Sequence, residues 1–290
     1  MKRLFTIIGT ALCALSCTTE AETTIDATTL ELTIPAEIKE GTPAATNYAT
    51  IDFEEYDLRL IMELYTAEET DKPYSRKEIY WDEQSTTFTL DELPTTGEYV
   101  ILGWADFVTT KGEDLHYDTS AGLRNIMQNE RAFNDDSYAA FALSTTIKDG
   151  KLAHQDVKLW PAASKYGIAI DDAEVAEQIS TIECEYIQYI STGFNVEAME
   201  PNTFDPTATT TGNKATLQDD SNLLATTYVL TEVGKQNNIN QNIRLKNSSG
   251  EEVLKYSGVV IPLYSDKYTE CTLAATEDKE PEFSTHKYLE

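Results

Sequence analysis

The sequence predicts an all-β protein built from two tandem β-sandwich domains with one short helix. Short segments in which apolar and polar residues alternate recur along the chain, as in half-buried strands. Threonine is abundant, and β-branched residues favour strands. With 41% hydrophobic and 10% aromatic residues, the 290-residue chain can bury a core. That length suits one large domain or two of roughly 130–150 residues.

The first set of strands is predicted before Pro161. Residues 58–65 place Leu58, Leu60 and Met62 on one face, which indicates a half-buried strand. Residues 98–108 are almost continuously apolar, so this longer strand should be buried on both faces, with Trp104 in the core. The remaining strands of this set are expected at 86–90, 138–147 and 152–159.

The second set follows Pro161. Strands are expected at 166–170, 180–190, 223–230, 239–246, 252–256 and 259–264. Residues 247–250 read Asn-Ser-Ser-Gly, which indicates a hairpin turn. Residues 200–220 are rich in Thr, Asn, Asp and Pro and are expected to form a long loop. One short helix is expected at 120–128, with Ser120 as its N-cap, and residues 172–178 are expected to add a turn or two.

The N-terminus is typical of a lipoprotein signal. A basic start, Met1-Lys2-Arg3, precedes an apolar run that is too short to span a bilayer. The run ends in Ala-Leu-Ser before Cys17, which resembles a bacterial lipobox. We expect a signal peptide at 1–16, lipid attachment at Cys17, and a polar tether at 17–27 that holds the folded part off the membrane.

The folded part is expected to divide near residue 155, into an N-terminal domain at 28–155 and a C-terminal domain at 156–290. Two cysteines remain in the second domain, Cys184 and Cys271, each on the apolar side of an alternating segment. An oxidising envelope permits a disulfide between them. Two separate buried thiols fit the same pattern.

Three segments resemble a known family. Residues 87–94 and 99–106, Thr-Phe-Thr-Leu-Asp-Glu-Leu-Pro and Tyr-Val-Ile-Leu-Gly-Trp-Ala-Asp, resemble the first domain of Bacteroidales fimbrillin-like lipoproteins. Residues 157–168 resemble the entry into that family's second domain, with Trp160 where the family tends to have Arg. The resemblance implies two transthyretin-like β-sandwiches and a role as an anchor or accessory subunit of a type V fimbria.

The charge and the motifs exclude several classes of function. A net charge of -28 excludes most nucleic-acid binding, which needs clusters of Lys and Arg. No nucleophile elbow, zinc-protease motif, phosphate loop or dinucleotide fingerprint is present, so we expect no enzyme activity, no cofactor and no metal site. His116, His154 and His286 share no ligand spacing and are expected on the surface or in loops. Residues 134–136 and 218–220 lack the spacing of a calcium loop and are expected to be solvated.

Two functions fit these observations. The first is an outer-membrane-anchored, surface lipoprotein that acts as a fimbrial anchor or minor subunit and pairs β-strands with other fimbrial subunits. The alternative is a cell-surface glycan-binding lipoprotein, for which Trp81 beside Tyr80 is the best exposed aromatic candidate. An open sheet edge would favour assembly, whereas exposed aromatic residues gathered on one face would favour glycan binding.

Overall fold

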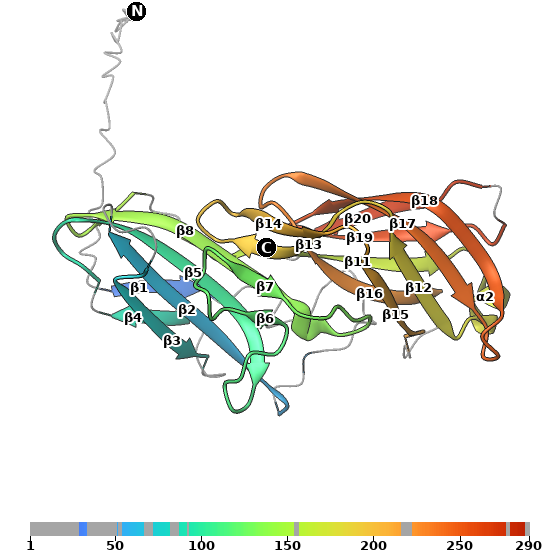
Figure 1. Ribbon diagram of the computed structural model, residues 1–290, viewed down its shortest axis with the longest axis horizontal. Coiled ribbons are helices and arrows are strands. Elements are labelled where there is room, and N and C mark those ends of the chain that lie inside the picture. Colours follow the sequence, from blue (N-terminus) through green and yellow to red (C-terminus); the bar gives the residue numbers. More distant parts are fainter. Residues whose placement is uncertain are drawn as a thin grey trace, which may run out of the picture.

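The structure is a computed structural model, and it confirms an all-β chain. It describes residues 29–33, 51, 54–66, 72–81, 87–91, 93–153, 157–215, 222–276 and 279–287. The described part is elongated, with one set of sheets at each end (Figure 1). Cys17 and the predicted signal peptide and tether lie outside the described residues, as do His154 and residues 218–220.

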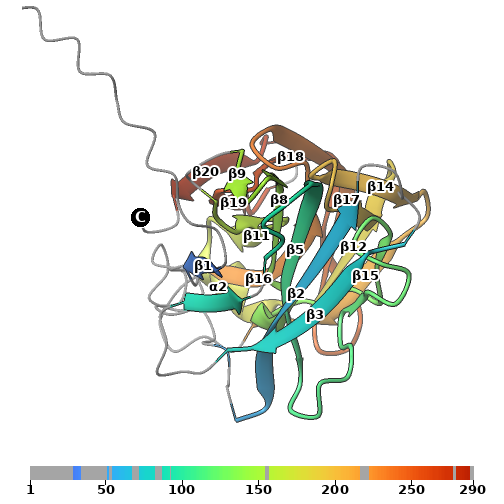
Figure 2. The same ribbon diagram turned by 90° about the vertical axis from the view of Figure 1, so that its left-hand side faces the viewer.

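The N-terminal half is a sandwich around a five-strand path with the order β10-β8-β5-β2-β3. Its strands are β2 (Tyr56–Thr66), β3 (Ser75–Tyr80), β5 (Glu98–Thr109), β8 (Ala140–Lys148), β9 (Lys151–Leu152), which pairs with β8, and β10 (Trp160–Pro161). Strand β5 is buried on both faces, as predicted. Strand β2 was expected to be half-buried, but its residues 58–65 are all buried, because layers lie on both of its faces. One further sheet pairs β1 (Thr29–Thr33) with β4 (Thr87–Asp91), and Leu32 and Phe88 from it enter the same core. Figure 2 shows this end of the molecule.

The C-terminal half is a second sandwich. Its strands are β11 (Ala163–Ile170), β12 (Thr181–Tyr186), β15 (Thr209–Asn213), β16 (Leu223–Leu230), β17 (Gln236–Lys246), β18 (Glu252–Tyr264), β19 (Lys267–Leu273) and β20 (Glu282–Lys287). Strands β18 and β19 pair only at Tyr264 and Lys267, so the chain passes there from one layer to the other. One layer runs β15-β12-β17-β18 and the other runs β16-β11-β19-β20. Side chains of both layers form one core, including Ile243 and Cys271.

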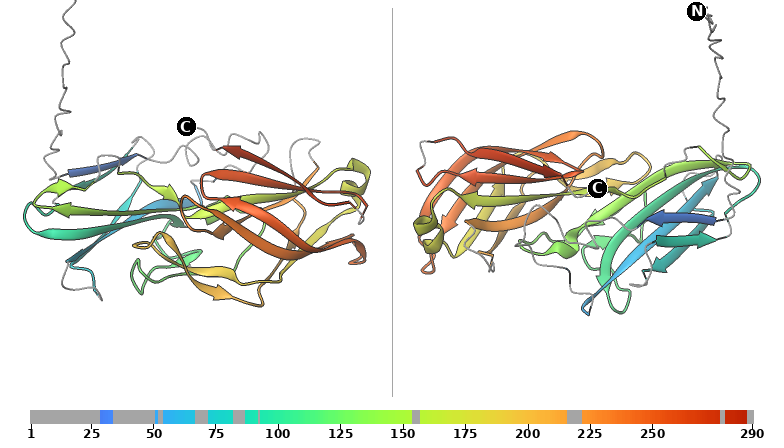
Figure 3. Two further views of the ribbon diagram at one scale, coloured as in Figure 1. Left: turned by 90° about the horizontal axis from the view of Figure 1, so that it is seen from above. Right: turned by 180° about the vertical axis from the view of Figure 1, so that it is seen from behind.

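A four-stranded sheet joins the two halves. Strands β6 (Tyr117–Asp118) and β7 (Ile126–Gln128) come from the N-terminal half, and β13 (Ile190–Asn195) and β14 (Glu200–Asp205) form a hairpin from the C-terminal half. The views in Figure 3 place this hairpin between the two sandwiches. Phe194 is fully buried against Trp104 of the N-terminal core, at 5.7 Å between ring centroids. The predicted boundary at 155/156 lies outside the described residues and stays a prediction.

The helix predicted at 120–128 is wrong. Gly122 has φ +88°, and two turns around it lead into β7. Ile126 then pairs with Phe194 of β13, and Gln128 pairs with Tyr117 of β6. Long-range strand pairing therefore overrides the local helix signal, because tertiary contacts outweigh a weak helix propensity.

The second helix signal is confirmed. Helix α2 (Ala173–Gln178) starts at Asp172, whose carboxylate accepts hydrogen bonds from the backbone N–H groups of Glu174 and Val175. A single 3₁₀ turn, η1 (Asp136–Tyr138), is the other helical element of the described residues. The long loop predicted at 200–220 is wrong over most of its described length, because β14 and β15 lie within it. The strand predicted at 152–159 is also wrong: β9 ends at Leu152, and residues 157–159 are not in a strand.

Candidate functional site

The last strand of the described residues, β20, forms an exposed edge. β20 pairs antiparallel with β19 through six residue pairs, from Lys267 with Lys287 to Thr272 with Glu282. Its side chains from Glu282 to His286 are all exposed, and Phe283 keeps 42% of its surface. The neighbouring β19 buries Tyr268, Cys271 and Leu273 instead. From Glu282 to His286, β20 therefore adds backbone hydrogen bonds to the sheet without adding a buried side chain.

The sequence of β20 explains this exposure. Its residues, Glu-Phe-Ser-Thr-His-Lys, carry one large apolar side chain and show no alternation of apolar and polar positions. Hydrophobic burial therefore stabilises the position of this strand only weakly, since the free energy of burial scales with the apolar area removed from water. An unblocked edge strand presents N–H and C=O groups to which another chain can pair.

The opposite edge of the same layer is closed. Along β16, Thr226 exchanges both backbone hydrogen bonds with Asn134, whose backbone N–H donates to the Thr226 carbonyl and whose side-chain oxygen accepts from the Thr226 N–H. The Ser191 hydroxyl donates to the Leu230 carbonyl. These contacts occupy backbone groups that a foreign strand would need, so the β20 side is the more accessible edge of this layer.

Buried charges lie far from this edge in the chain. Arg59 is 2% exposed and donates two hydrogen bonds to the carboxylate of Asp106, at 3.1 and 2.9 Å, and one to Asp114 at 2.7 Å. Burial raises the pKa of Asp106 to about 6, and the charge of Arg59 opposes that rise. A second buried carboxylate, Glu63, accepts from Arg76 and from the hydroxyl of Tyr65.

His116 lies in a loop, as predicted, but it is buried there. Its Nε2 lies 2.6 Å from the Ser137 hydroxyl, and its ring stacks on Tyr138 with 3.5 Å between centroids. Burial lowers the pKa of His116 to about 4, although the nearby Asp135 carboxylate acts in the opposite direction. His286 lies on β20 and is exposed.

Both cysteines of the C-terminal half are buried free thiols in this structure. Cys184 lies on β12 and Cys271 on β19, in facing layers of the same core. Burial raises the pKa of the Cys271 thiol to about 12 and that of Cys184 further, so neither is a reactive thiolate at neutral pH. The disulfide stays a prediction.

The remaining candidates are placed as follows. Trp104 is fully buried, as predicted, whereas Trp81 is half-buried against the N-terminal core. Of residues 134–136, expected to be a solvated loop, Asp136 instead pairs with the buried Lys165 at 2.5 Å. Within the described ranges, no group of three or more His, Cys, Asp or Glu side chains is arranged to hold a metal ion. No helix of the described residues is long and apolar enough to cross a membrane.

Several solved structures are similar to this chain. The tip fimbrial protein Mfa3 of Porphyromonas gingivalis, with a C-terminal truncation, is 12% identical, with a TM-score of 0.49 over 90% of this chain and 100% of that one. A candidate adhesin of Bacteroides ovatus is 11% identical, with a TM-score of 0.44 over 79% and 84% of the two chains. A candidate cell adhesion protein of Bacteroides eggerthii is 10% identical, with a TM-score of 0.43 over 91% and 96%. These values are too low to carry an argument about function.

Sequence comparison gives the family. No curated protein matches the chain. A family model matches residues 20–272, a range that starts before β1 and ends within β19. The chain therefore belongs to DUF6562, a family of unknown function.

Proposed function

We propose that the protein is an anchor or accessory subunit of a fimbria and that a strand of another subunit pairs with its β19–β20 edge. The observation that carries this proposal is the exposure of β20 on both faces. A partner strand that displaces β20 would replace its backbone hydrogen bonds and would uncover no buried side chain among Glu282 to His286. The resemblance of residues 87–106 and 157–168 to fimbrillin-like lipoproteins supports the same reading.

The second part of the proposal is attachment to the outer membrane at the cell surface through a lipid on Cys17. A chain tethered by acyl groups is suited to hold the base of a polymer, since two or more acyl chains give stable anchoring. Mass spectrometry of the membrane fraction should find Cys17 as an acylated N-terminal residue. An unmodified N-terminus at another position would contradict this part alone.

Strand pairing is tested by recovering partners from the native envelope with the full-length protein. Phe283→Lys with Thr285→Lys places two charges on β20, and lysines on an edge oppose pairing with another strand. The matched control, Tyr74→Lys with Tyr80→Lys, adds the same charge at exposed positions beside and on β3. Wild type and control should recover fimbrial subunits at low and at high salt, because screening acts on exposed charges and hardly on a paired strand.

The β20 variant should lose that recovery. Equal recovery by the β20 variant would show that this edge is not used. No fimbrial subunit recovered by the wild type would reject the fimbrial role itself.

A further inference from the structure

A hollow of about 330 Å³ lies in the C-terminal half, beside the β13–β14 hairpin, and no residue of β20 lines it. The β13–β14 hairpin forms one wall, and the end of β16, the start of β17 and Leu263 of β18 form the other. This volume is at the lower end of small-molecule sites, which run from about 300 to 1,000 Å³. The hollow therefore has room for a ligand the size of a monosaccharide.

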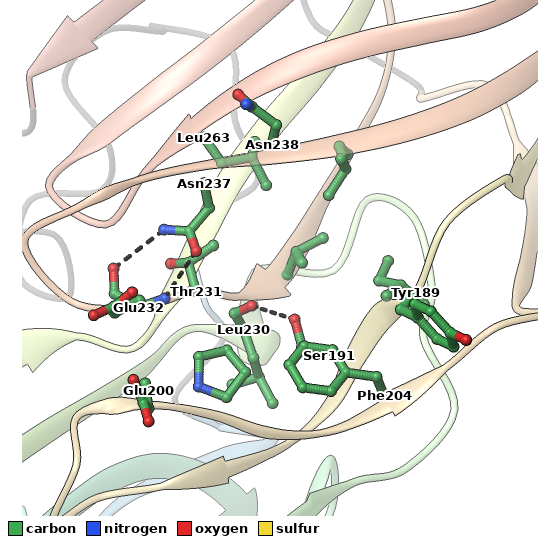
Figure 4. A pocket seen from close by; sticks show the side chains of 14 residues that line it. Tyr189, Ser191, Glu200, Phe204, Leu230, Thr231, Glu232, Asn237, Asn238 and Leu263 are labelled. Carbon is green, nitrogen blue, oxygen red and sulfur yellow. Dashed lines mark hydrogen bonds between the residues drawn. The ribbon is translucent and has the colours of Figure 1, made fainter.

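Two aromatic side chains of this lining are unusually exposed. Tyr189 keeps 72% of its surface and Phe204 keeps 50%. In Figure 4, Tyr189 stands at one end of the group, and the ring of Phe204 reaches in from β14 towards Ser191. Exposed aromatic faces of this kind offer apolar area to a ligand that keeps polar groups at its edge.

Polar groups gather at the other end of the hollow. Glu232 forms an ion pair with Lys235, whose pKa is raised chiefly by that contact and slightly by Glu200. No hydrogen bond or ion pair joins the Glu200 side chain to another described residue, and it is exposed. Two carboxylates with one ammonium group leave an excess of negative charge, which disfavours sulfated, sialylated or phosphorylated ligands.

The backbone around the hollow is held in place before any ligand binds. The Asn237 side chain donates to the carbonyls of Glu232 and Lys235 and accepts from the Glu232 N–H, which fixes the turn before β17. Ser191 ties β13 to the Leu230 carbonyl at 2.5 Å. Figure 4 draws the Asn237 contacts with Glu232 and the Ser191 contact as dashed lines. A preformed wall lowers the entropy lost on binding.

We propose that this hollow binds one neutral hexose residue of a glycan. The apolar face of the pyranose ring lies against Phe204, with Tyr189 extending the contact, and ring hydroxyls donate to the Glu200 carboxylate. The site is independent of strand pairing at β20, so either function can fail while the other stands.

The test starts with the full-length protein on an array of glycans that end in glucose, galactose, mannose, N-acetylhexosamine, sialic acid or sulfated sugars. The neutral sugar retained there is then titrated by calorimetry against the wild type and single variants. Phe204→Ala, Tyr189→Ala and Glu200→Gln should each weaken binding by about tenfold, which corresponds to about 1.4 kcal/mol. Tyr74→Ala is the control, because Tyr74 is 67% exposed and belongs to the N-terminal half.

These variants should not disturb folding, because Phe204 and Tyr189 are half exposed or more and Glu200→Gln keeps the size of an exposed side chain. Unfolding temperatures of the variants check this. The proposal is supported by retention of a neutral glycan with loss in the three variants and none in the control. Retention of no neutral glycan, preference for sialylated or sulfated glycans, or equal binding by Phe204→Ala and wild type would each overturn it.

Discussion

The two sandwiches differ in how many charged side chains they bury. The N-terminal half buries Arg59, Glu63, Asp106 and His116, each with a partner from a distant part of the chain. Among the described residues of the C-terminal half, Lys165 on β11 is the one charged side chain buried to this degree, and its partner, Asp136, belongs to the N-terminal half. Buried ion pairs fix which groups must meet, because an unpaired buried charge is costly. The main core cluster of the C-terminal half is apolar, and at one edge of this half lies β20, whose described side chains from Glu282 to His286 are exposed.

Among the predictions that compare the two halves, loss of the buried Asp106 carboxylate should reduce the free energy of unfolding most. Asp106→Ala should destabilise the fold by about 3–5 kcal/mol, because Arg59 loses the partner that receives two of its hydrogen bonds. Asp114→Ala is the matched control: its side chain is 29% exposed, and its loss should cost about 1 kcal/mol or less. Denaturant unfolding measures both. Similar losses for the two would mean that burial does not set the cost.

A second prediction concerns the seam between the halves. Phe194→Ala should cost about 3 kcal/mol or more, since it removes a fully buried ring that packs on Trp104. Phe204→Ala, one strand away and half exposed, should cost less than about 0.5 kcal/mol. If Phe194→Ala proved as mild as Phe204→Ala, the hairpin would not be part of the N-terminal core in solution.

The buried histidine predicts a pH dependence that belongs to the N-terminal half. The pKa of His116 in the folded protein is about 4, below its ordinary value of 6.5. Between these values the unfolded chain binds a proton that the folded chain does not, so stability falls as the pH drops through this window. The loss attributable to His116 should reach about 2–3 kcal/mol at pH 4.

His116→Asn checks this prediction. Chemical unfolding at several pH values should show a weaker decline from pH 6.5 to pH 4 in the variant than in the wild type. His286→Asn, at an exposed position on β20, should leave the decline unchanged. Parallel declines in the wild type and His116→Asn would show that other groups carry the acid sensitivity.

The smallest effect is expected at the exposed edge. Phe283→Ala should change the free energy of unfolding by less than about 0.5 kcal/mol, because Phe283 packs into no core cluster. Hydrogen exchange should be faster in β20 than in β11, which lies in the same layer and is buried throughout. Equal protection of β20 and β11 from hydrogen exchange would show that the exposed edge strand is held as firmly as the buried strand.

Local patterns were enough to predict several elements. The alternation in 58–65 and the apolar run at 98–108 predicted β2 and β5, and the Asn-Ser-Ser-Gly segment predicted the turn between β17 and β18. Asp172 was correctly identified as the start of a short helical segment. These features depend on residues within one or two turns of each other, which is the range that periodicity and capping report.

The hollow beside the β13–β14 hairpin could not be predicted from local sequence patterns. Glycan binding was assigned to Trp81, which packs on the N-terminal core, whereas Tyr189 and Phe204 lie in segments expected to be the end of a strand and a loop. The one sequence signal for this site was that Tyr189 and Phe204 are aromatic residues in polar segments. Their meeting with Glu200 and Asn237 depends on the pairing of β13 and β14, which no local pattern gives.

The sequence alone determined that the chain is all-β, where most of its longer strands run, and that Trp104 is buried, because alternation and apolar content act within a single segment. Tertiary structure decided that residues 126–128 form a strand, that the 190–205 hairpin packs on the other half, and that β20 lies at an exposed edge. Each of these outcomes depends on a partner strand. Backbone pairing and the burial it brings are set by residues distant in the sequence, so a weak local preference yields to them.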